Sequence, residues 1–132
     1  MGTFASIEEA REHFKKDRFA TDAGMQIDEM WDDGCVCSVV LSDGHKNAYG
    51  GIMGGVIFTL ADLALAVTAN QIHSLSVASQ VSINYLSAPK GTKLLARARC
   101  IKNGKTTTVI NVDVTDDTGR DVAVFIGTAF KL

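Results

Sequence analysis

Gly54-Gly-Val-Ile-Phe-Thr-Leu-Ala-Asp62-Leu-Ala-Leu-Ala-Val-Thr-Ala-Asn70 is the stretch that decides the fold of this chain. It is an almost wholly apolar run of helix-forming length, and Asp62 is the one charged residue in it. A helix that is apolar on every side is expected to be buried on every side. The sequence therefore predicts one long core helix around which the rest of the chain packs.

The carboxylate of Asp62 is the most informative group in this stretch. A buried carboxylate is costly unless it is paired or hydrogen-bonded. The residues alone leave two interpretations open, a structural hydrogen-bond partner or a group held for chemistry. Gly54 and Gly55 stand where the helix begins, so backbone N–H groups at its positive end can approach a ligand without a Cβ in the way.

Gly55 and Asp62 cannot serve the same atom from one helix. They are seven residues apart, which is about 10 Å at the helical rise per residue. Reacting groups must lie about 3 Å apart. If the site is catalytic, the carboxylate that serves one glycine turn comes from a second copy of the helix, and a two-fold homodimer is the simplest assembly that provides it.

Length and charge restrict the class of protein. At 132 residues the chain is expected to form one domain, residues 1–132, with a core that needs no disulfide staples. Its net charge of −2 and its sequence pI near 5.8 argue against a nucleic-acid-binding domain, which would present a strongly basic face.

The cysteines and the N-terminal segment predict a cytoplasmic protein. Three cysteines give no disulfide framework, and Cys35 and Cys37 are expected on one face of a strand as reduced core thiols rather than metal ligands. The charged N-terminal segment lacks the apolar core of a signal peptide. Residues 50–69 are long enough to span a membrane, but Asp62 near their middle argues against insertion.

The rest of the chain predicts an antiparallel sheet that covers the core helix. Ser6 and Glu9 have capping-box spacing at the start of a helix over 6–19. Alternating apolar residues predict strands over 25–31, 35–41, 77–85, 93–101, 106–114 and 122–130. Asn103-Gly104 is a strong hairpin signal between two of them. The fold class is therefore α+β, with five or six strands wrapped around one long helix on the concave face of the sheet.

This arrangement is that of the hotdog fold, and the helix start carries a more specific likeness. It resembles the signature of the PaaI-like thioesterases of the phenylacetic-acid pathway: Asn, a Gly-rich loop, His-Gly-Gly, two apolar residues, Phe, Ser or Thr, Leu, Ala and Asp. The matching residues here are Asn47-Ala-Tyr-Gly-Gly-Ile-Met53-Gly54-Gly55-Val-Ile-Phe58-Thr-Leu-Ala-Asp62. The likeness continues through 77–85 and 103–106.

The resemblance implies hydrolysis of acyl-CoA thioesters at a homodimer interface, without a metal or other cofactor. Gly55, with Gly54, matches the turn whose backbone N–H polarises the thioester carbonyl. Asp62 matches the carboxylate that acts from the partner subunit as a general base or a nucleophile. Asn47 matches a loop residue that positions water or the carbonyl, although it is also a good turn residue.

Met53 departs from the family pattern, which has His at this position. A thioether cannot donate a strong hydrogen bond or titrate. Loss of one such contact would cost about 10²-fold in rate, by analogy with the loss of an oxyanion donor. His45, eight residues earlier in the same loop, is a candidate substitute.

Further residues are candidates for substrate binding. Phe58, with Leu60, Met53 and Tyr85, is expected to line the acyl pocket, and Ser79 to lie near the attacking water. Lys90 and Lys105 stand at strand ends, where they can meet CoA phosphates or simply be solvated.

Other functions share this fold. Because Met53 replaces His, a non-catalytic acyl-CoA-binding or sensing domain is the main alternative, and hydratase or dehydratase chemistry is a weaker one. The expected assembly is a homodimer or a dimer of dimers.

Overall fold

Six antiparallel strands form one curved sheet in the computed structural model, which describes residues 2–132. The order across the sheet is β1-β2-β4-β5-β6-β3. The strands are β1 (Gln26–Trp31), β2 (Gly34–Val40), β3 (Ser76–Tyr85), β4 (Lys93–Asn103), β5 (Thr107–Asp116) and β6 (Asp121–Lys131). The predicted strands are all present, with ends shifted by one or two residues, and β1 and β3 are the two edges.

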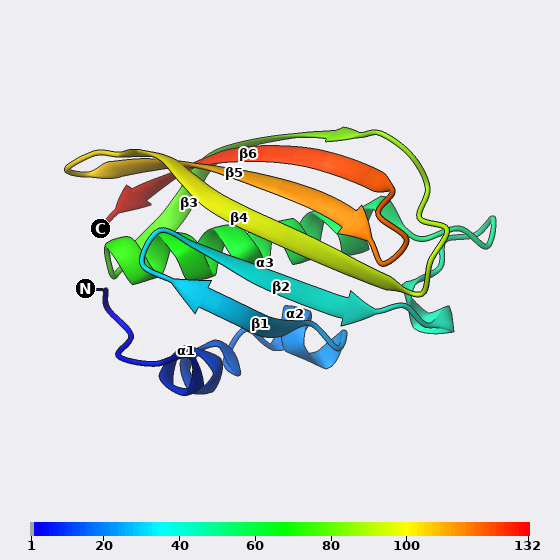
Figure 1. The fold of residues 1–132 in the computed structure, drawn as a ribbon, viewed down its shortest axis with the longest axis horizontal. Helices are drawn as coiled ribbons and strands as arrows, with labels where there is room; N and C mark the ends of the chain where they lie inside the picture. The colour runs from blue at the N-terminus through cyan, green and yellow to red at the C-terminus, as the bar shows by residue number, and fades with distance from the viewer. Residues whose placement is uncertain (1) are drawn as a thin grey trace.

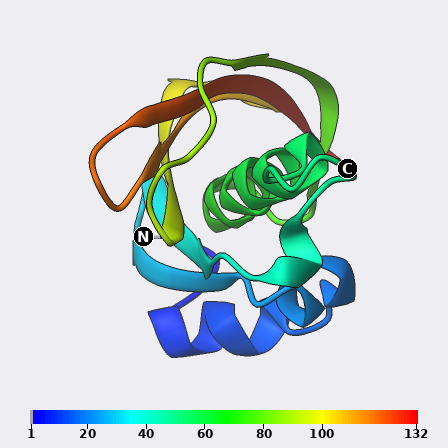
Figure 2. The same cartoon turned by 90° about the vertical axis from the view of Figure 1, so that its right-hand side faces the viewer.

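Helix α3 (Gly54–Ile72) lies along the concave side of this sheet. Figure 2 shows the strands curving around this helix. Leu60, Ala61, Ala64 and Val67 are fully buried between helix and sheet. The helix is long and apolar enough to cross a membrane by length and composition alone, but most of it is buried inside the fold. The predicted core helix is confirmed.

One strip of α3 is not covered, which corrects the expectation of a helix buried on every side. Gly55 is exposed, and Phe58, Thr59, Asp62 and Ala66 are only partly buried. These positions are spaced three or four residues apart and therefore share one face of the helix. The sheet and the N-terminal segment cover the remaining faces, so the strip is open within a single chain.

The N-terminal segment forms two helices rather than the single helix predicted over 6–19. They are α1 (Ile7–Phe14) and α2 (Arg18–Asp22). Ser6 caps α1 as predicted, because its hydroxyl oxygen accepts a hydrogen bond from the Glu9 N–H at 3.2 Å. Phe14 and Ala20 are both buried, yet six residues apart they would point in different directions from one straight helix. The break at 15–17 lets both side chains reach the core.

Candidate active site

Asp62 places a carboxylate on the open strip of α3. The side chain is half-buried. Burial raises the pKa of this carboxyl, and the nearby Asp17 carboxylate raises it further. Within residues 2–132 no hydrogen bond or ion pair stabilises the charged form. The structure therefore holds an unpaired carboxylate at the side of an otherwise apolar helix, which favours the chemical interpretation over the structural one.

Two hollows meet at Asp62. One, of about 290 Å³, lies between residues 17–20 and the first half of α3, where Phe58 and Thr59 line it. The other, of about 260 Å³, lies between α1, α3 and the start of β3, where Val77 and Ala78 line it. Asp17 lines both, which accounts for its electrostatic effect on Asp62. A ligand can therefore approach this carboxylate from the direction of α2 or from the edge of the sheet.

The first turn of α3 presents free backbone N–H groups. Gly54 and Gly55 occupy its first two positions, where an amide has no carbonyl partner within the helix. Met53, the residue before them, has an extended backbone and no capping side-chain hydrogen bond. A Cβ placed on Gly55 would meet only the Met53 side chain, at 4.0 Å. Gly55 is also exposed, so a ligand can approach its backbone.

Tyr85 fixes this helix start from the end of β3. Its hydroxyl donates a hydrogen bond to the Gly54 carbonyl oxygen at 3.1 Å, and a Cβ on Gly54 would come within 3.3 Å of its ring. The sequence suggested Tyr85 only as a pocket residue, and no local signal indicated this contact across 31 residues. Leu60, suggested for the same pocket, is fully buried in the core and does not face it.

Asn47 organises the glycine-rich loop that leads into α3. Its Oδ1 accepts hydrogen bonds from the Tyr49 N–H at 2.9 Å and the Gly51 N–H at 3.1 Å. Its own backbone N–H bonds the Gly51 carbonyl at 2.7 Å. Gly50, at the tip, has φ of +83°, a conformation that favours glycine. The turn role of Asn47 is thus present, and the residue is exposed.

His45 is built into the fold and is not placed to substitute for the missing histidine. Its side chain is buried. Its Nδ1 accepts a hydrogen bond from the Ser42 N–H at 3.0 Å, so its Nε2–H donates to the Ala23 carbonyl at 2.8 Å. Both ring nitrogens are therefore occupied. Met53 is 54% exposed, and no imidazole takes over the position that its side chain fills.

Phe58 and Ser79 differ in their relation to Asp62. The Phe58 ring lies edge-on against Phe125, with 5.4 Å between ring centroids, and lines the hollow on the α2 side of Asp62. Ser79 lies at a bulge in β3, where its hydroxyl donates to the Thr128 carbonyl at 3.2 Å. It lines neither Asp62 hollow, whereas Ala78 next to it does. Neighbouring side chains in a strand point to opposite faces, which accounts for this difference.

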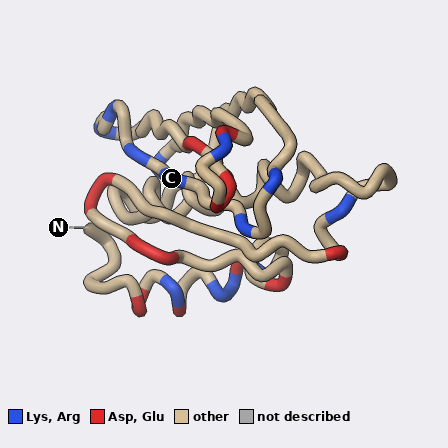
Figure 3. Tube along the Cα trace, turned by 45° about the vertical axis from the view of Figure 1, so that its right-hand side comes forward, with Lys and Arg blue, Asp and Glu red and all other residues tan. Residues whose placement is uncertain are grey.

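Lys90 and Lys105 are exposed at opposite ends of the molecule. Lys90 lies in the connection from β3 to β4, whose residues line a hollow together with the loop that leads into α3. Lys105 lies in the β4–β5 hairpin. There the carbonyl oxygen of Gly104 accepts a hydrogen bond from Nε2 of His73, at the other end of α3, over 2.9 Å. One chain does not bring the two lysines together. Figure 3 shows basic and acidic residues interspersed over the trace in that view.

Asp116 positions the segment that carries Lys90, and sequence analysis did not single it out. Its carboxylate accepts hydrogen bonds from the N–H groups of Lys90 at 2.7 Å and Gly91 at 3.0 Å. It also accepts from the Thr118 hydroxyl at 2.6 Å and the Arg120 N–H at 3.0 Å. These donors, the Thr118 hydroxyl first, hold the pKa of Asp116 well below its usual range. The Asp-Asp-Thr-Gly sequence signalled only a turn.

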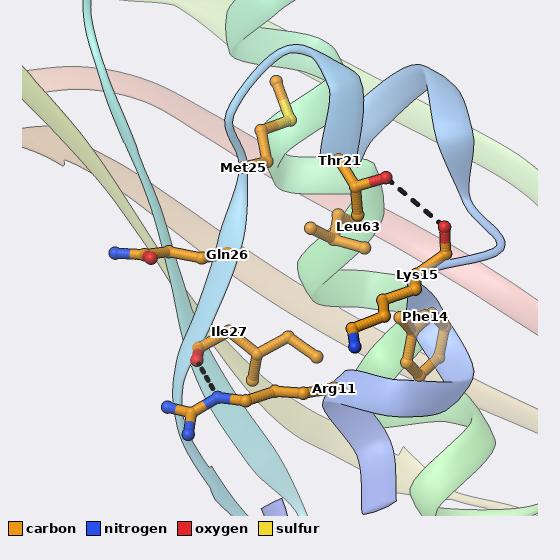
Figure 4. Close-up of a pocket in the computed structure, with 8 residues that line it drawn as sticks. All are labelled: Arg11, Phe14, Lys15, Thr21, Met25, Gln26, Ile27 and Leu63. Atoms are coloured by element: carbon orange, nitrogen blue, oxygen red, sulfur yellow. Dashed lines mark hydrogen bonds between the residues drawn. The ribbon is translucent and has the colours of Figure 1, made fainter. Parts of the chain in front are cut away.

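A further hollow of about 240 Å³ lies between α1 and β1 (Figure 4). Phe14, Met25, Ile27 and Leu63 give it an apolar floor, and Arg11 reaches across it to donate a hydrogen bond to the Ile27 carbonyl at 2.9 Å. None of the residues that line it is a carboxylate or a histidine. Among residues 2–132 there is also no group of three or more metal-ligating side chains. Asp62, by contrast, lines two hollows.

Comparison with known proteins gives consistent matches. Residues 49–123 match the family model of the thioesterase superfamily. The acyl-coenzyme A thioesterase PaaI of Escherichia coli K12 is 28% identical over 120 residues, which are 90% of this chain and 86% of that protein. The solved structure of E. coli PaaI, from the phenylacetic acid degradation operon, superposes with a TM-score of 0.87 over 96% of each chain, at 26% identity.

Two similar structures were solved with a ligand. A hypothetical thioesterase of Streptococcus pneumoniae TIGR4, solved with coenzyme A, is 33% identical, with a TM-score of 0.81 over 89% of this chain and 94% of that one. A Streptococcus mutans UA159 protein bound to acetyl CoA is 32% identical, with a TM-score of 0.76 over 80% and 86%.

Proposed function

This chain belongs to the thioesterase superfamily as a PaaI-like thioester hydrolase with the hotdog fold, and from that premise we propose that it hydrolyses acyl-CoA to a free acid and CoA at Asp62. The observation that carries the proposal is the unpaired, half-buried Asp62 carboxylate on the open strip of α3. CoA and acetyl CoA in the two streptococcal relatives support the substrate class.

The proposed reaction uses the start of α3 and its middle. The Gly55 N–H, at the positive end of the helix, donates to the thioester oxygen and stabilises the negative charge of the tetrahedral intermediate. The ionised Asp62 either takes a proton from the attacking water or attacks the carbonyl itself, forming an anhydride that water then cleaves. On the first route the C–S bond then breaks and the CoA sulfur takes the proton that Asp62 accepted. On the second route the C–S bond breaks as the anhydride forms, CoA leaves as a thiolate, and the water that cleaves the anhydride supplies its proton. In this proposal the Nδ2 group of Asn47 holds the water or the carbonyl.

The two groups come from different subunits in this proposal. Gly55 and Asp62 are separated by about 10 Å along one helix, whereas they must meet at the same carbonyl carbon. A two-fold homodimer that places two α3 helices side by side gives each Gly55 a partner Asp62. The proposed assembly is this homodimer or a dimer of two such dimers.

The surface available to a partner supports this dimer. β3 is an edge strand of ten residues whose outer edge is unpaired within the chain. The open strip of α3 lies beside it, because Asp62 and Ala66 share a hollow with Val77 and Ala78. A long unpaired edge strand invites pairing with another strand. Pairing of β3 with its two-fold copy would extend the sheet and bring the second α3 to the strip.

Four further predicted residues would contact a CoA ester that lies across this interface. Phe58 contacts the acyl group, Met53 lies beside the Gly54-Gly55 turn, and Lys90 and Lys105 are available as point charges for phosphates. Because the two lysines lie at opposite ends of one chain, a single CoA can use both only if they come from different subunits. The three cysteines are free, which fits the reducing cytoplasm as the compartment we propose.

Free-thiol release tests the reaction. Wild type and Asp62→Asn are assayed with acetyl-, octanoyl-, palmitoyl- and phenylacetyl-CoA, with Asp113→Asn, an exposed carboxylate on the outer face of β5, as matched control. We expect turnover in wild type and the control and a loss of at least about 10³-fold in Asp62→Asn. Binding of acyl-CoA without turnover in wild type would instead support the binding-domain alternative.

Mixed dimers test the shared site. Gly55→Pro removes the proposed donor N–H at a first-turn position that tolerates proline. Each variant alone is expected to be inactive, but a mixed dimer with Asp62→Asn has one intact site. Random mixing then restores about a quarter of wild-type activity, because half of the dimers are mixed and each has one of two sites. No recovery in verified mixed dimers would contradict a site shared between subunits.

A further inference from the structure

Phe19 is an exposed aromatic side chain beside the candidate active site. It is 82% exposed, whereas its neighbour Ala20 is buried. A single exposed apolar side chain needs no explanation by itself. Phe19, however, lines the same hollow as the Asp62 carboxylate and the Phe58 ring, so two aromatic rings flank the entry to the proposed reacting group.

The α3 wall of this hollow is fixed. The Phe58 ring is held edge-on by Phe125 at 5.4 Å between centroids. The Thr59 hydroxyl donates to the Gly55 carbonyl oxygen at 2.7 Å, so its hydrogen is already used. What this wall offers a ligand beside the Asp62 carboxylate is therefore mainly the apolar surface of Phe58 and Leu63.

The α2 wall is anchored from behind. The Ala20 carbonyl accepts a hydrogen bond from the Met25 N–H at 3.1 Å, and the Thr21 hydroxyl donates to the Asp17 carbonyl at 3.0 Å. These two bonds fix the shape of α2 and of the turn after it, while the buried Ala20 side chain and the bond from His45 Nε2–H to the carbonyl of Ala23, the C-cap of α2, hold the short helix against the core. Phe19 is thus presented by a fixed element, although its own side chain buries little surface.

The size of the hollow restricts what can lie in it. Its volume is about 290 Å³, roughly twice that of a cavity of about 150 Å³ that accepts benzene. A hollow of this volume has room for an aryl group or a medium aliphatic chain, whereas an acetyl group fills only a small part of it.

We propose that Phe19 is a specificity-determining residue whose ring forms the outer wall of the acyl pocket. This inference rests on the proposed acyl-CoA thioesterase activity of the same site. The contact between the Phe19 ring and the acyl group increases with acyl size, so Phe19 stabilises the transition state for octanoyl or phenylacetyl esters and contributes nothing for acetyl esters.

The test compares kcat/KM for acetyl-, octanoyl- and phenylacetyl-CoA in wild type, Phe19→Ala and Phe19→Leu. Phe19→Ala is expected to lower kcat/KM for the two larger esters by about tenfold, with the acetyl ester unchanged within about twofold. Phe19→Leu keeps an apolar side chain and is expected to recover part of the loss for the octanoyl ester. Phe130→Ala, an exposed aromatic on the outer face of β6, is the matched control and should leave all three values unchanged.

Two results would overturn this role. One is an equal loss for every ester, above all with a lower Tm or an altered oligomeric state, because Phe19 would then be a structural or subunit contact. The other is an unchanged ratio among the esters in both Phe19 variants. If wild type hydrolyses none of the esters, the proposed function itself fails, and that result is distinct from an active enzyme whose acyl preference ignores Phe19.

Discussion

The hydroxyl of Tyr85, at the end of β3, donates a hydrogen bond to the Gly54 carbonyl oxygen, at the start of α3, over 3.1 Å. This bond ties the edge strand to the helix turn that carries the proposed Gly55 donor. Tyr85→Phe removes only the hydroxyl, and a net hydrogen bond of about 1 kcal/mol corresponds to roughly fivefold. We therefore expect kcat/KM to fall two- to tenfold, as measured by thiol release.

Tyr49→Phe is the control for that prediction. Tyr49 is 98% exposed in the loop before α3, so loss of its hydroxyl removes the same atom without a packed partner. An equal loss of activity in both variants would show that the Tyr85 to Gly54 bond does not position the turn.

Asp62 is expected to reduce the stability of the protein while it serves activity. Burial and Asp17 raise its pKa in the folded state, so ionising Asp62 costs more in the folded than in the unfolded chain. At acid pH Asp62 is protonated and does not destabilise the folded protein. As pH rises through the folded pKa, the carboxyl ionises and the protein loses stability. Asp62→Asn, which cannot ionise, should have a higher Tm than wild type at pH 7, and the difference should shrink toward pH 4. A lower Tm at pH 7 would contradict this account.

The same shift gives the pH dependence of activity. Both proposed roles require the ionised carboxylate, so kcat/KM is expected to fall as pH decreases through the Asp62 pKa. Asp17→Asn removes a neighbouring negative charge, which should move this acid limb to lower pH. Profiles of kcat/KM against pH for wild type and Asp17→Asn measure the position of this acid limb. An unchanged position would exclude Asp17 as a cause of the raised Asp62 pKa.

Most of the fold follows from local patterns in the sequence. Alternation over 93–101 and the Asn103-Gly104 turn predicted the β4–β5 hairpin, and the apolar run from Gly54 predicted α3. The open strip at Asp62 was not predictable in the same way. An apolar pattern predicts that a face is buried, but it does not show whether the chain's own sheet or another subunit covers that face. In one chain, a face of α3 that the sequence predicted to be buried is therefore uncovered.

The details of the site depend on contacts between distant residues. His45 looked like an available loop histidine, but its ring binds Ala23, 22 residues away. The Asp116 carboxylate lies 26 residues from the Lys90 amide that it holds. The bulge that turns Ser79 to the Thr128 carbonyl shifts the strand by one residue, and periodicity does not reveal such a shift. Both Asp62 and His45 were candidates by residue type. Only the packed structure shows that the two ring nitrogens of His45 are bonded, whereas the Asp62 carboxylate is unpaired.

Gly127 provides a test of how α3 is seated on the sheet. It lies on the inner face of β6, and an added Cβ would come within 2.3 Å of the Leu65 Cδ1. Overpacking of this kind costs about 1–3 kcal/mol. Gly127→Ala should therefore lower the free energy of unfolding in urea by that amount. In a Leu65→Ala background the same substitution should cost much less, because the clashing methyl is gone. Equal costs in both backgrounds would contradict direct contact.

Asp116 should stabilise the β3–β4 connection down to acid pH. Its pKa is depressed in the folded protein by its hydrogen-bond donors, so its contribution is present above the unfolded pKa and is lost only as pH falls through the folded value. Asp116→Asn should lower Tm at pH 7 by more than Asp113→Asn, whose side chain is exposed. It should also raise KM for acyl-CoA if Lys90 binds phosphate. Equal Tm values for the two variants would argue against this role.

Met53 marks the position where the chain departs from the PaaI-like pattern, and restoring His is the direct test of its effect. The Met53 Sδ lies 4.0 Å from where a Cβ on Gly55 would stand, so a side chain at 53 reaches the space beside the Gly55 amide. A ring N–H placed there adds a second donor to the developing oxyanion, and one such donor is worth about 10²-fold in kcat.

Met53 is half-exposed and its side chain makes no capping hydrogen bond, so Met53→His should keep its Tm while kcat rises by about 10- to 100-fold. Met53→Leu, which adds no donor, is the control and should match wild type. If Met53→His gains nothing while its fold and KM are unchanged, the Gly55 amide and the helix dipole already supply the stabilisation, and the family histidine is dispensable in this active site.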